Sequence, residues 1–342
     1  MSGASSRLAA ASTAAASPGP WPAPSVQLVG VGGYLPPRVV TNHELAARLD
    51  TSDAWIRERT GIVQRHLVGP GETAASMGIA AGRAALEAAG IEAGEVDAVI
   101  LATSTPDQAF PATALRVQAG LGIERGFGFD LSAACSGFIF GLSTAAAFIR
   151  AGQVRTALVV GSEVYSRILD WQDRSTCVLF GDGAGAVVLR AGEAGSERGL
   201  LSSHLHADGR TGDLLFIDGA VGRPDQPGVL RMNGREVFRH AVTKLSASVD
   251  EALAANGLGH ADVDWLVPHQ ANKRIIDAMG KKLALPPERV IVTVDRHANT
   301  SAASIPLALN EAVRDGRIRR GDLVLMEALG GGLTWGSALV RM

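Results

Sequence analysis

The chain has 342 residues, 46% of them hydrophobic, which is enough to bury a large core and exceeds the usual size of one domain. Its formal net charge of −2 at pH 7 argues against non-specific nucleic-acid binding, although it leaves room for local basic patches. The sequence has no uninterrupted apolar stretch of membrane-spanning length, and its two cysteines form neither a disulfide framework nor a metal-ligand pattern, so we expect a soluble cytoplasmic protein.

Residues 1–25 are rich in Ala, Ser and Pro and contain no acidic residue. Because such a segment lacks the apolar bulk needed for packing, we predict a disordered arm. A secretory signal is not indicated, since the apolar centre is mostly Ala, with only Leu8 for bulk, and Arg7 alone is a weak positive region. An unprocessed tail and a short organelle transit peptide both remain open.

From Val26 onward, short β-branched runs alternate with amphipathic helical segments. This alternation predicts an α/β layered fold with parallel strand pairing. The expected strands cover residues 27–31, 98–103, 126–130, 157–161, 178–190, 265–268, 290–294, 323–327 and 337–341. The expected helices cover residues 42–49, 74–89, 136–151, 235–256, 273–284 and 302–315.

The two halves of the chain resemble each other. Residues 85–101 align without a gap with residues 252–268, and both segments have the pattern of a helix, a glycine stop, Val-Asp and a strand. Further similar segments follow in the same order in both halves, which indicates a tandem duplication. We therefore predict two similar α/β halves, residues 26–195 and residues 196–342, with a cleft between them that is a common place for a site.

Cys135, in the segment Asp-Leu-Ser-Ala-Ala-Cys-Ser-Gly-Phe, is the candidate nucleophile of the first half. It opens the expected helix 136–151, where unpaired N–H groups and the helix dipole favour an anion. A thiol with a free pKa of about 8.5 would there be partly thiolate near neutral pH. Cys177 has no helix start or polar partner nearby and is interpreted as a structural cysteine.

His269, in Val-Pro-His-Gln-Ala-Asn, and Asn299, in His-Ala-Asn-Thr-Ser-Ala, are the candidate partners from the second half. Each alone could be a helix cap or a satisfied core group. Together with Cys135 they predict a Cys-His-Asn site in which the nucleophile faces its partners across the junction of the halves. The glycines 330–332 could bring backbone N–H groups close to a ligand and complete an oxyanion hole with the amide of Cys135.

Several motifs in register together resemble the β-ketoacyl-ACP synthase III family, and the resemblance runs from about Val26 to Met342. This family has a duplicated thiolase fold and works as a homodimer, which agrees with the internal repeat. The motifs are TSDAWIRERTGI (51–62), AACSGF (133–138), FGDGAG (180–185), HQAN (269–272), NTSAAS (299–304) and GGGLTWG (330–336).

The resemblance implies the first condensation of type II fatty-acid synthesis. Cys135 would take an acyl group from acyl-CoA, and malonyl-ACP would lose carbon dioxide to give a carbanion that attacks the thioester and yields 3-oxoacyl-ACP. His269 and Asn299 would stabilise the enolate, and the amides of Cys135 and Gly331 would bind the acyl oxyanion. Acyl carrier protein and acyl-CoA are the implied partners, and neither a metal nor a redox cofactor is implied.

The resemblance also implies residues that bind the two substrates. Trp55 and Arg174 would sandwich the adenine of CoA, and Phe110 would cap the acyl pocket of the partner subunit. Basic pairs on the faces of two expected helices would dock the acidic carrier. The implied CoA-binding residues are Thr51, Trp55, Arg59, Arg174 and Asn272, the acyl-pocket residues are Phe110 and Leu329, and the carrier-binding residues are Arg235, Arg239, Gln270, Arg274 and Lys281.

The sequence departs from the family pattern where Leu329 and Leu333 replace aromatic residues. This leaves the acyl chain open, with acetyl-CoA as the default primer and branched or longer primers as alternatives. A thiolase-fold enzyme of specialised metabolism that makes another ketide or an ester with the same triad is the main alternative function. A papain-like hydrolase lacks its Cys-Gly-Ser-Cys-Trp signature here, and a non-enzymatic scaffold would predict a decayed triad.

Overall fold

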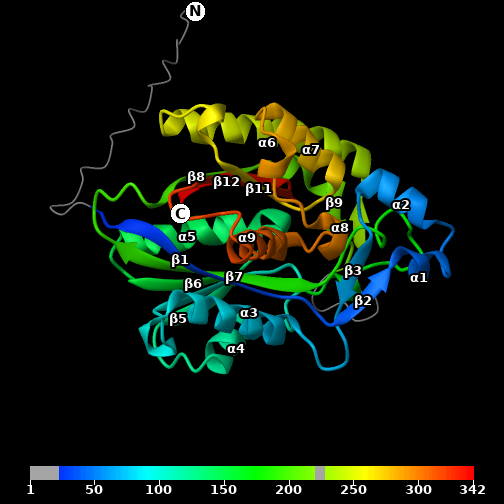
Figure 1. The fold of residues 1–342 in the computed structure, drawn as a ribbon. Coiled ribbons are helices and arrows are strands. Elements are labelled where there is room, and N and C mark those ends of the chain that lie inside the picture. The colour runs from blue at the N-terminus through cyan, green and yellow to red at the C-terminus, as the bar shows by residue number, and fades with distance from the viewer. Residues whose placement is uncertain (1–22, 220–227) are drawn as a thin grey trace, which may run out of the picture.

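The computed structural model describes residues 23–219 and 228–342. The predicted arm therefore lies almost entirely outside the described residues. Within them, two sheets alternate with three layers of helices (Figure 1). No helix of this part of the chain is long and apolar enough to cross a bilayer.

The first sheet has five strands in the order β1-β7-β6-β4-β5, drawn from residues 25–192. β4 pairs in parallel with both β5 and β6, whereas β7 runs antiparallel to β6 and β1. Its strands are β1 (Ser25–Tyr34), β4 (Ala98–Ala102), β5 (Phe127–Leu131), β6 (Thr156–Glu163) and β7 (Gly183–Gly192).

The second sheet has four strands in the order β11-β12-β13-β8, drawn from residues 199–341. β11 and β12 are parallel, and β13 runs antiparallel to β12 and β8. Its strands are β8 (Gly199–Ala207), β11 (Trp265–Pro268), β12 (Leu323–Gly330) and β13 (Thr334–Arg341). Two small antiparallel strand pairs lie outside the main sheets: β2 (Arg38–Thr41) with β3 (Gln64–Leu67), and β9 (Leu215–Ile217) with β10 (Leu230–Met232).

The helices fill the three layers in a regular way. α3 and α4 cover the outer face of the first sheet, α5 and α9 lie between the sheets, and α6 and α7 cover the second sheet (Figure 1). The helices are α1 (Asn42–Ala46), α2 (Asp53–Thr60), α3 (Ala74–Ala89), α4 (Thr113–Gly120), α5 (Gly137–Arg150), α6 (Gly234–Ala255), α7 (Lys273–Lys282), α8 (Val294–His297) and α9 (Ser304–Arg314).

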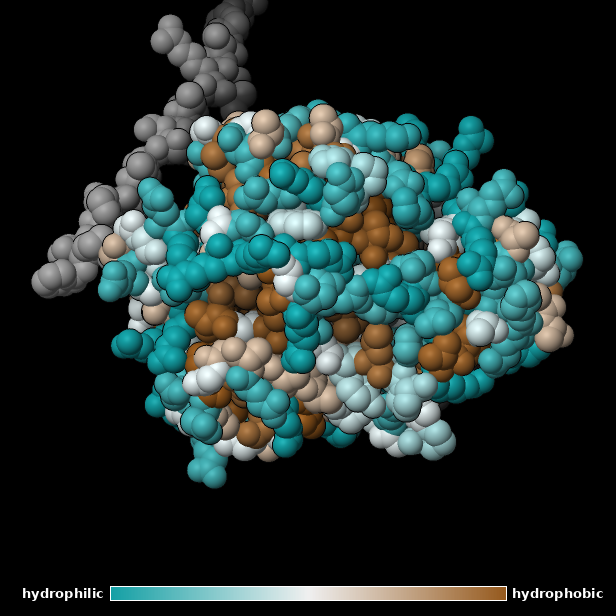
Figure 2. All heavy atoms as spheres, in the orientation of Figure 1, coloured by the Kyte–Doolittle hydropathy of each residue, from teal (hydrophilic) through white to brown (hydrophobic). Residues whose placement is uncertain are grey.

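The apolar core is divided by these layers. One cluster fills the space between α3, α4 and the first sheet, a second surrounds α5 and α9, and a third packs α6 and α7 on the second sheet. Hydrophilic side chains cover most of the face seen in Figure 2, and apolar side chains show between the helical layers. The site described below lies where the second and third clusters meet the loops at the strand ends.

The register of the sheets follows the duplication. The gap-free alignment matches Ala98 with Trp265. In the structure these two residues have equivalent partners, since Ala98 on β4 pairs with Ala157 on β6, and Trp265 on β11 pairs with Val324 on β12. The glycine stops of the aligned helices, Gly90 and Gly257, both have positive φ, at 63° and 66°, where glycine is favoured. The duplicated α/β fold is therefore confirmed.

Two expected strands differ in the structure. At 290–294 there is only an isolated bridge between Leu266 and Val290. The Ile291 N–H still donates to Leu266, but the N–H groups of Thr293 and Val294 donate to the Gln270 side chain rather than to a strand. The strand expected at 178–190 begins only at Gly183, since the backbone before it bonds to other loops. The pairing is also mixed rather than purely parallel, and α2, α4 and β8 were not predicted.

Candidate active site

Cys135 lies at the junction between the first sheet and the central helical layer. It belongs to a single 3₁₀ turn, Ala134–Ser136, that leads directly into α5, and its side chain is buried. Ala134 enters this turn with φ at 45°, a left-handed conformation that is costly for a non-glycine residue and is often found at functional sites. The turn places the thiol at the amino end of a buried helix, as predicted.

His269 follows β11, and its ring is held by one hydrogen bond. Its Nδ1 lies 2.7 Å from the hydroxyl of Ser304, the first residue of α9. The same hydroxyl accepts the backbone N–H of Gln270, at 3.3 Å, and can therefore direct its own hydrogen to Nδ1. That tautomer leaves Nε2–H as a donor towards the pocket.

Asn299 is fixed by its own backbone and by its side-chain oxygen. Its N–H donates to Leu179, and its carbonyl accepts from Gly181 at 3.0 Å, so the segment is locked beside β7. A Cβ at Gly181 would lie 2.9 Å from the His297 carbonyl oxygen, which explains the glycine there. Asn299 Oδ1 accepts the N–H of Ser301 at 2.9 Å, so the Nδ2 group is the end that remains available as a donor.

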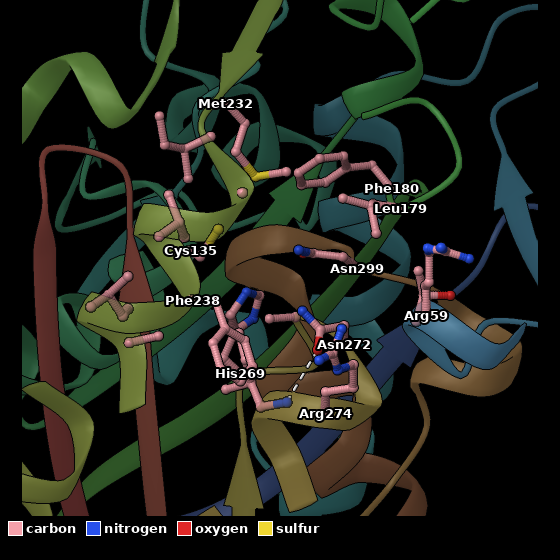
Figure 3. A pocket seen from close by; sticks show the side chains of 18 of the residues that line it. Arg59, Cys135, Leu179, Phe180, Met232, Phe238, His269, Asn272, Arg274 and Asn299 are labelled. Carbon is pink, nitrogen blue, oxygen red and sulfur yellow. Dashed lines mark hydrogen bonds between the residues drawn. The ribbon is translucent and has the colours of Figure 1, made fainter. Parts of the chain in front are cut away.

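These three side chains line one cavity of about 440 Å³. In Figure 3, Cys135, His269 and Asn299 come from separate segments and surround the same hollow. The structure thus brings together the three residues that the sequence singled out. Its remaining walls are mostly apolar and come from α6, α7, the pair β9–β10, the end of β12 and the segment before β7. The apolar lining residues include Leu179, Leu215, Met232, Val237, Phe238, Ala241, Leu245, Ile275 and Leu329.

Burial controls the charge of the two titratable members. It raises the pKa of the Cys135 thiol to about 12, although the hydroxyl groups of Ser301 and Tyr165 act in the opposite direction. Burial also lowers the pKa of His269 to about 3. The resting site therefore holds a neutral thiol and a neutral imidazole, and the expectation that Cys135 is partly thiolate at neutral pH is corrected by the loss of solvation.

The glycines at the end of β12 and directly after it lie against the nucleophile. A Cβ at Gly330 would be only 2.5 Å from the backbone nitrogen of Cys135, so no larger residue fits there without a shift. The chain continues through Gly331, the second candidate for the oxyanion hole, and Leu329, immediately before Gly330, lines the cavity. Backbone thus approaches the thiol from the second half of the chain.

The mouth of the cavity carries aromatic and basic side chains. Trp55 on α2 has the Arg59 guanidinium 4.5 Å from its ring centroid and that of Arg174 at 5.4 Å. Arg174 also bonds to Asp50 and, unlike Trp55 and Arg59, is not among the lining residues. Thr51 lies just before α2, and its hydroxyl is buried without a hydrogen-bond partner among residues 23–219 and 228–342.

A second group of basic residues surrounds the mouth on α6 and α7. Arg235 and Arg274 line the opening, and the Arg274 guanidinium lies 5.6 Å from the ring of Phe238. Arg239 is exposed one turn further along α6, where it pairs with Glu236 at 2.6 Å. Lys281 is exposed at the far end of α7, and Asn272 both caps α7 and lines the cavity.

Gln270 was expected on the carrier-binding surface, and the structure corrects this. Its side chain is completely buried. Its Nε2 donates to the carbonyls of Pro268 and Ile291, and its Oε1 accepts from Thr293 and Val294. Every polar atom of the amide is used to hold the loop beside His269, so none is left for a partner.

Phe110 lies away from this cavity, on the loop before α4, and is 84% exposed. It does not line the cavity of its own chain.

Sequence reasoning assigned no role to four polar residues around the site. Ser304 orients His269, and Ser301 orients Asn299. Both occur in the segment Asn-Thr-Ser-Ala-Ala-Ser after Asn299, but nothing in the sequence gave either hydroxyl a partner. Glu163, at the end of β6, and Tyr165, two residues later, are buried next to Cys135 and gave no signal, because only the fold brings them there.

Comparison with known proteins gives consistent matches over most of the chain. The family model described as 3-oxoacyl-[acyl-carrier-protein (ACP)] synthase III matches residues 129–209, and its C-terminal counterpart matches residues 253–342. The chain is 73% identical to a β-ketoacyl-[acyl-carrier-protein] synthase III from Acidiphilium cryptum, over 92% of this chain and 98% of that protein. It is 67% identical, with the same coverage, to the protein of that name from Granulibacter bethesdensis.

Solved structures are similar as well. The crystal structure of 3-oxoacyl-(acyl carrier protein) synthase III from Pseudomonas aeruginosa matches with a TM-score of 0.88 at 47% identity, covering 93% of this chain and 98% of that one. A priming β-ketosynthase from the R1128 polyketide pathway matches with a TM-score of 0.89 at 37% identity, covering 94% and 97%. OleA from Xanthomonas campestris, at 22% identity, shares the fold.

Proposed function

The chain belongs to the β-ketoacyl-ACP synthase III family of acyltransferase-type condensing enzymes, and we propose that Cys135, His269 and Asn299 divide its reaction into two half-reactions. In the first, Cys135 takes an acyl group from acyl-CoA. In the second, malonyl-ACP loses carbon dioxide, and the resulting carbanion attacks the acyl thioester to give 3-oxoacyl-ACP. Dividing the reaction in this way replaces one difficult encounter with two positioned steps.

The observation that carries this proposal is the pair of neutral N–H donors opposite the thiol. Ser304 holds Nδ1 of His269, and Ser301 holds Oδ1 of Asn299, so that Nε2–H and Nδ2–H are the groups left for a ligand. A decarboxylation that leaves an enolate needs fixed donors at the developing oxyanion, and a dry site makes such donors stronger. Because the His269 imidazole is neutral, it stabilises the oxyanion as a donor and not as a standing cation.

The acyl step uses the other side of the cavity. Cys135 lies at the start of α5, where free N–H groups and the helix dipole stabilise negative charge on sulfur. The amides of Cys135 and Gly331 would bind the thioester oxygen during transfer. The close contact between Gly330 and the Cys135 nitrogen supports this assignment, since it requires a backbone without a side chain next to the nucleophile.

The mouth of the cavity suits the two carriers of the acyl groups. Trp55 offers an aromatic face for the adenine of CoA, with Arg59 and Arg174 beside it. Thr51, whose buried hydroxyl has no partner in the part of the chain that the structure describes, and Asn272 at the cavity wall complete this group. The exposed cations Arg235, Arg239, Arg274 and Lys281 on α6 and α7 form the surface for the acidic carrier protein.

The primer in this proposal is acetyl-CoA by default. Identity to proteins named as β-ketoacyl-ACP synthase III reaches 73%, compared with 37% to the priming synthase of a polyketide pathway, which favours fatty-acid synthesis over specialised metabolism. We also propose a homodimer, in which a partner subunit's copy of Phe110 closes the acyl end of the site. The proposed reaction needs no cofactor. The exposed Phe110 ring and the free edge of β5 support this assembly.

Intact-protein mass spectrometry with a panel of acyl-CoAs tests the proposal. One acyl group should be added to the parent protein, and peptide mapping should place it on Cys135. The Cys177→Ala variant is the matched control for the other buried thiol and should be acylated like the parent. Acylation of Cys177, or no acylation with any short acyl-CoA, would overturn the assignment of the nucleophile.

A further inference from the structure

A carboxyl group is buried directly behind the nucleophile. Glu163, the last residue of β6, is completely buried and has no cationic partner among the described residues. Its oxygens accept the hydroxyl of Thr105 at 2.6 Å, that of Thr103 at 3.2 Å, the N–H of Ser104 at 3.0 Å and the hydroxyl of Ser301 at 3.1 Å. Neutral donors alone therefore stabilise its charge.

Ser301 connects this carboxyl group to the thiol. Its hydroxyl lies 3.1 Å from Glu163 Oε1, and its turn, Ser301–Ala303, packs against the turn that carries Cys135, where Ser301 lowers the pKa of the thiol. Ser301 keeps this position in a left-handed conformation, with φ at 50°, while its N–H holds Asn299. A serine hydroxyl both donates and accepts, so it can receive one proton and release another in the same step.

Acylation requires that the thiol lose its proton inside a buried site. His269 is a poor acceptor, because its Nδ1 is engaged by Ser304 and burial opposes its cationic form. A thiolate that formed beside an ionised Glu163 would place two negative charges together in a low-dielectric site. Transfer of the proton to Glu163 avoids this, since the thiolate is then the only negative charge in the cluster, and the cluster becomes neutral once Cys135 is acylated.

We propose that Glu163 is a positioning residue that holds the thiol proton, acting through Ser301, between the two half-reactions; this inference rests on the proposed function. In acylation, the S–H bond of Cys135 breaks, its proton passes to Ser301 Oγ, and the Ser301 hydroxyl proton passes to Glu163 Oε1. The thiolate attacks the thioester and expels the CoA thiolate, which takes a proton from water on release. In condensation, the expelled Cys135 thiolate recovers its proton from Glu163 along the same path.

The surrounding groups are suited to this exchange. The titratable groups that face Glu163 are the Cys135 thiol and the Tyr165 phenol, and His269 faces Cys135 across the cavity. Burial raises the pKa of Tyr165 above its ordinary value, so the phenol stays a neutral donor, and its ring stacks on Phe180 at 4.8 Å. Burial raises the pKa of Glu163 to about 7, so the carboxylate is available at neutral pH and accepts a proton readily.

Single-turnover acylation of Cys135, followed by mass between pH 5.5 and 9, tests the proposal. The parent rate should fall as the pH drops below about 7, because a protonated Glu163 cannot accept the proton. Glu163→Gln keeps the shape of the side chain but loses the proton acceptor, so it should lower the rate at pH 7 on the order of 100-fold. It should also remove the acidic limb of the pH profile, which is the fall in rate below about pH 7. Its rate should instead rise steadily with pH as the thiol itself ionises.

Two further variants separate proton transfer from structure. Glu163→Asp keeps a carboxylate and should retain the acidic limb. Thr103→Val removes one hydrogen bond to Glu163, together with the one that Thr103 accepts from the Thr105 N–H, and leaves Cys135 and Ser301 unchanged, so its acylation rate should stay within about threefold of the parent. Should Glu163→Gln not fold, Ser301→Ala interrupts the same path and should lose the same limb.

The possible outcomes are distinct. If Glu163 acted only as a charge beside the thiol, Glu163→Gln would lower the thiol's pKa and acylate as fast as the parent or faster. That result, or an unchanged acidic limb in Glu163→Gln or Ser301→Ala, overturns the inference and leaves the proposed function intact. If the parent protein itself is not acylated on Cys135, the proposed function fails instead.

Discussion

The two halves of the molecule contain the same turn with different side chains. In the first half, a left-handed residue, Ala134, opens a 3₁₀ turn that runs into α5; in the second, Ser301 does the same before α9. The first turn carries the thiol at its next position, Cys135, where the second carries Ala302. The second turn instead carries the hydroxyl of Ser301, and Asn299 lies two residues before it. Duplication thus supplied one backbone, and substitution gave one copy the nucleophile and the other copy the donors.

The sharpest way to break this comparison is to remove the donors of the second half. His269→Ala or Asn299→Ala should lower condensation by about 10²–10³-fold, the usual effect of losing one donor to an oxyanion. Acylation of Cys135 should change far less, because neither donor contacts the acyl group in that step. Rapid-quench assays of each half-reaction provide the measurement. Equal losses in both half-reactions would show that the halves do not divide the chemistry.

The proposed carrier-binding surface also belongs to the second half of the molecule, since its cations lie on α6 and α7. The comparison of the two halves therefore extends from the buried site to the exterior. Reversal of Arg239 and Arg274 to Glu should raise KM for malonyl-ACP about tenfold at low salt, because the acidic carrier then meets like charge. Acylation of Cys135 by an acyl thioester without the phosphates of CoA should stay normal. The matched control reverses the exposed Arg83 and Arg320, which changes net charge equally. A KM that does not change would exclude this face.

The smallest effect concerns the shared backbone of the two turns. A β-branched residue is strained at positive φ, so Ala134→Val should lower the free energy of unfolding by about 1–3 kcal/mol, whereas Ala134→Gly should leave it nearly unchanged. Urea denaturation of both variants measures the difference. Equal stabilities would mean that the turn carries no strain in solution.

The sequence was most informative where function and local pattern coincide. The repeat predicted two equivalent halves, and the bounds of α3 and β11 agree with their predicted ranges because periodicity and glycine stops define them. Cys135, His269 and Asn299 were found because each combines a reactive side chain with a small-residue setting at the end of an element. The structure then placed all three around one cavity.

What the sequence could not provide depends on long-range contacts. The strand expected at 290–294 failed because a buried glutamine, Gln270, takes its backbone donors, and the same burial removes Gln270 from the carrier surface. Burial also reversed the expected ionisation of Cys135. Glu163 and Ser301 are 138 positions apart in the chain, so no local pattern could have joined them. These are tertiary effects that propensity does not contain.

Decarboxylation of malonyl-ACP by the Cys135→Ala variant tests the division of labour most directly. The donors of the second half remain in place, so the variant should still release carbon dioxide although it cannot be acylated. Because burial lowers the pKa of His269 to about 3, the imidazole stays neutral, and the rate should be level between pH 6 and 8. Complete loss of decarboxylation would contradict the account. So would a rate that falls as the pH is lowered from 8 to 6, because a histidine with an ordinary pKa becomes protonated over that range.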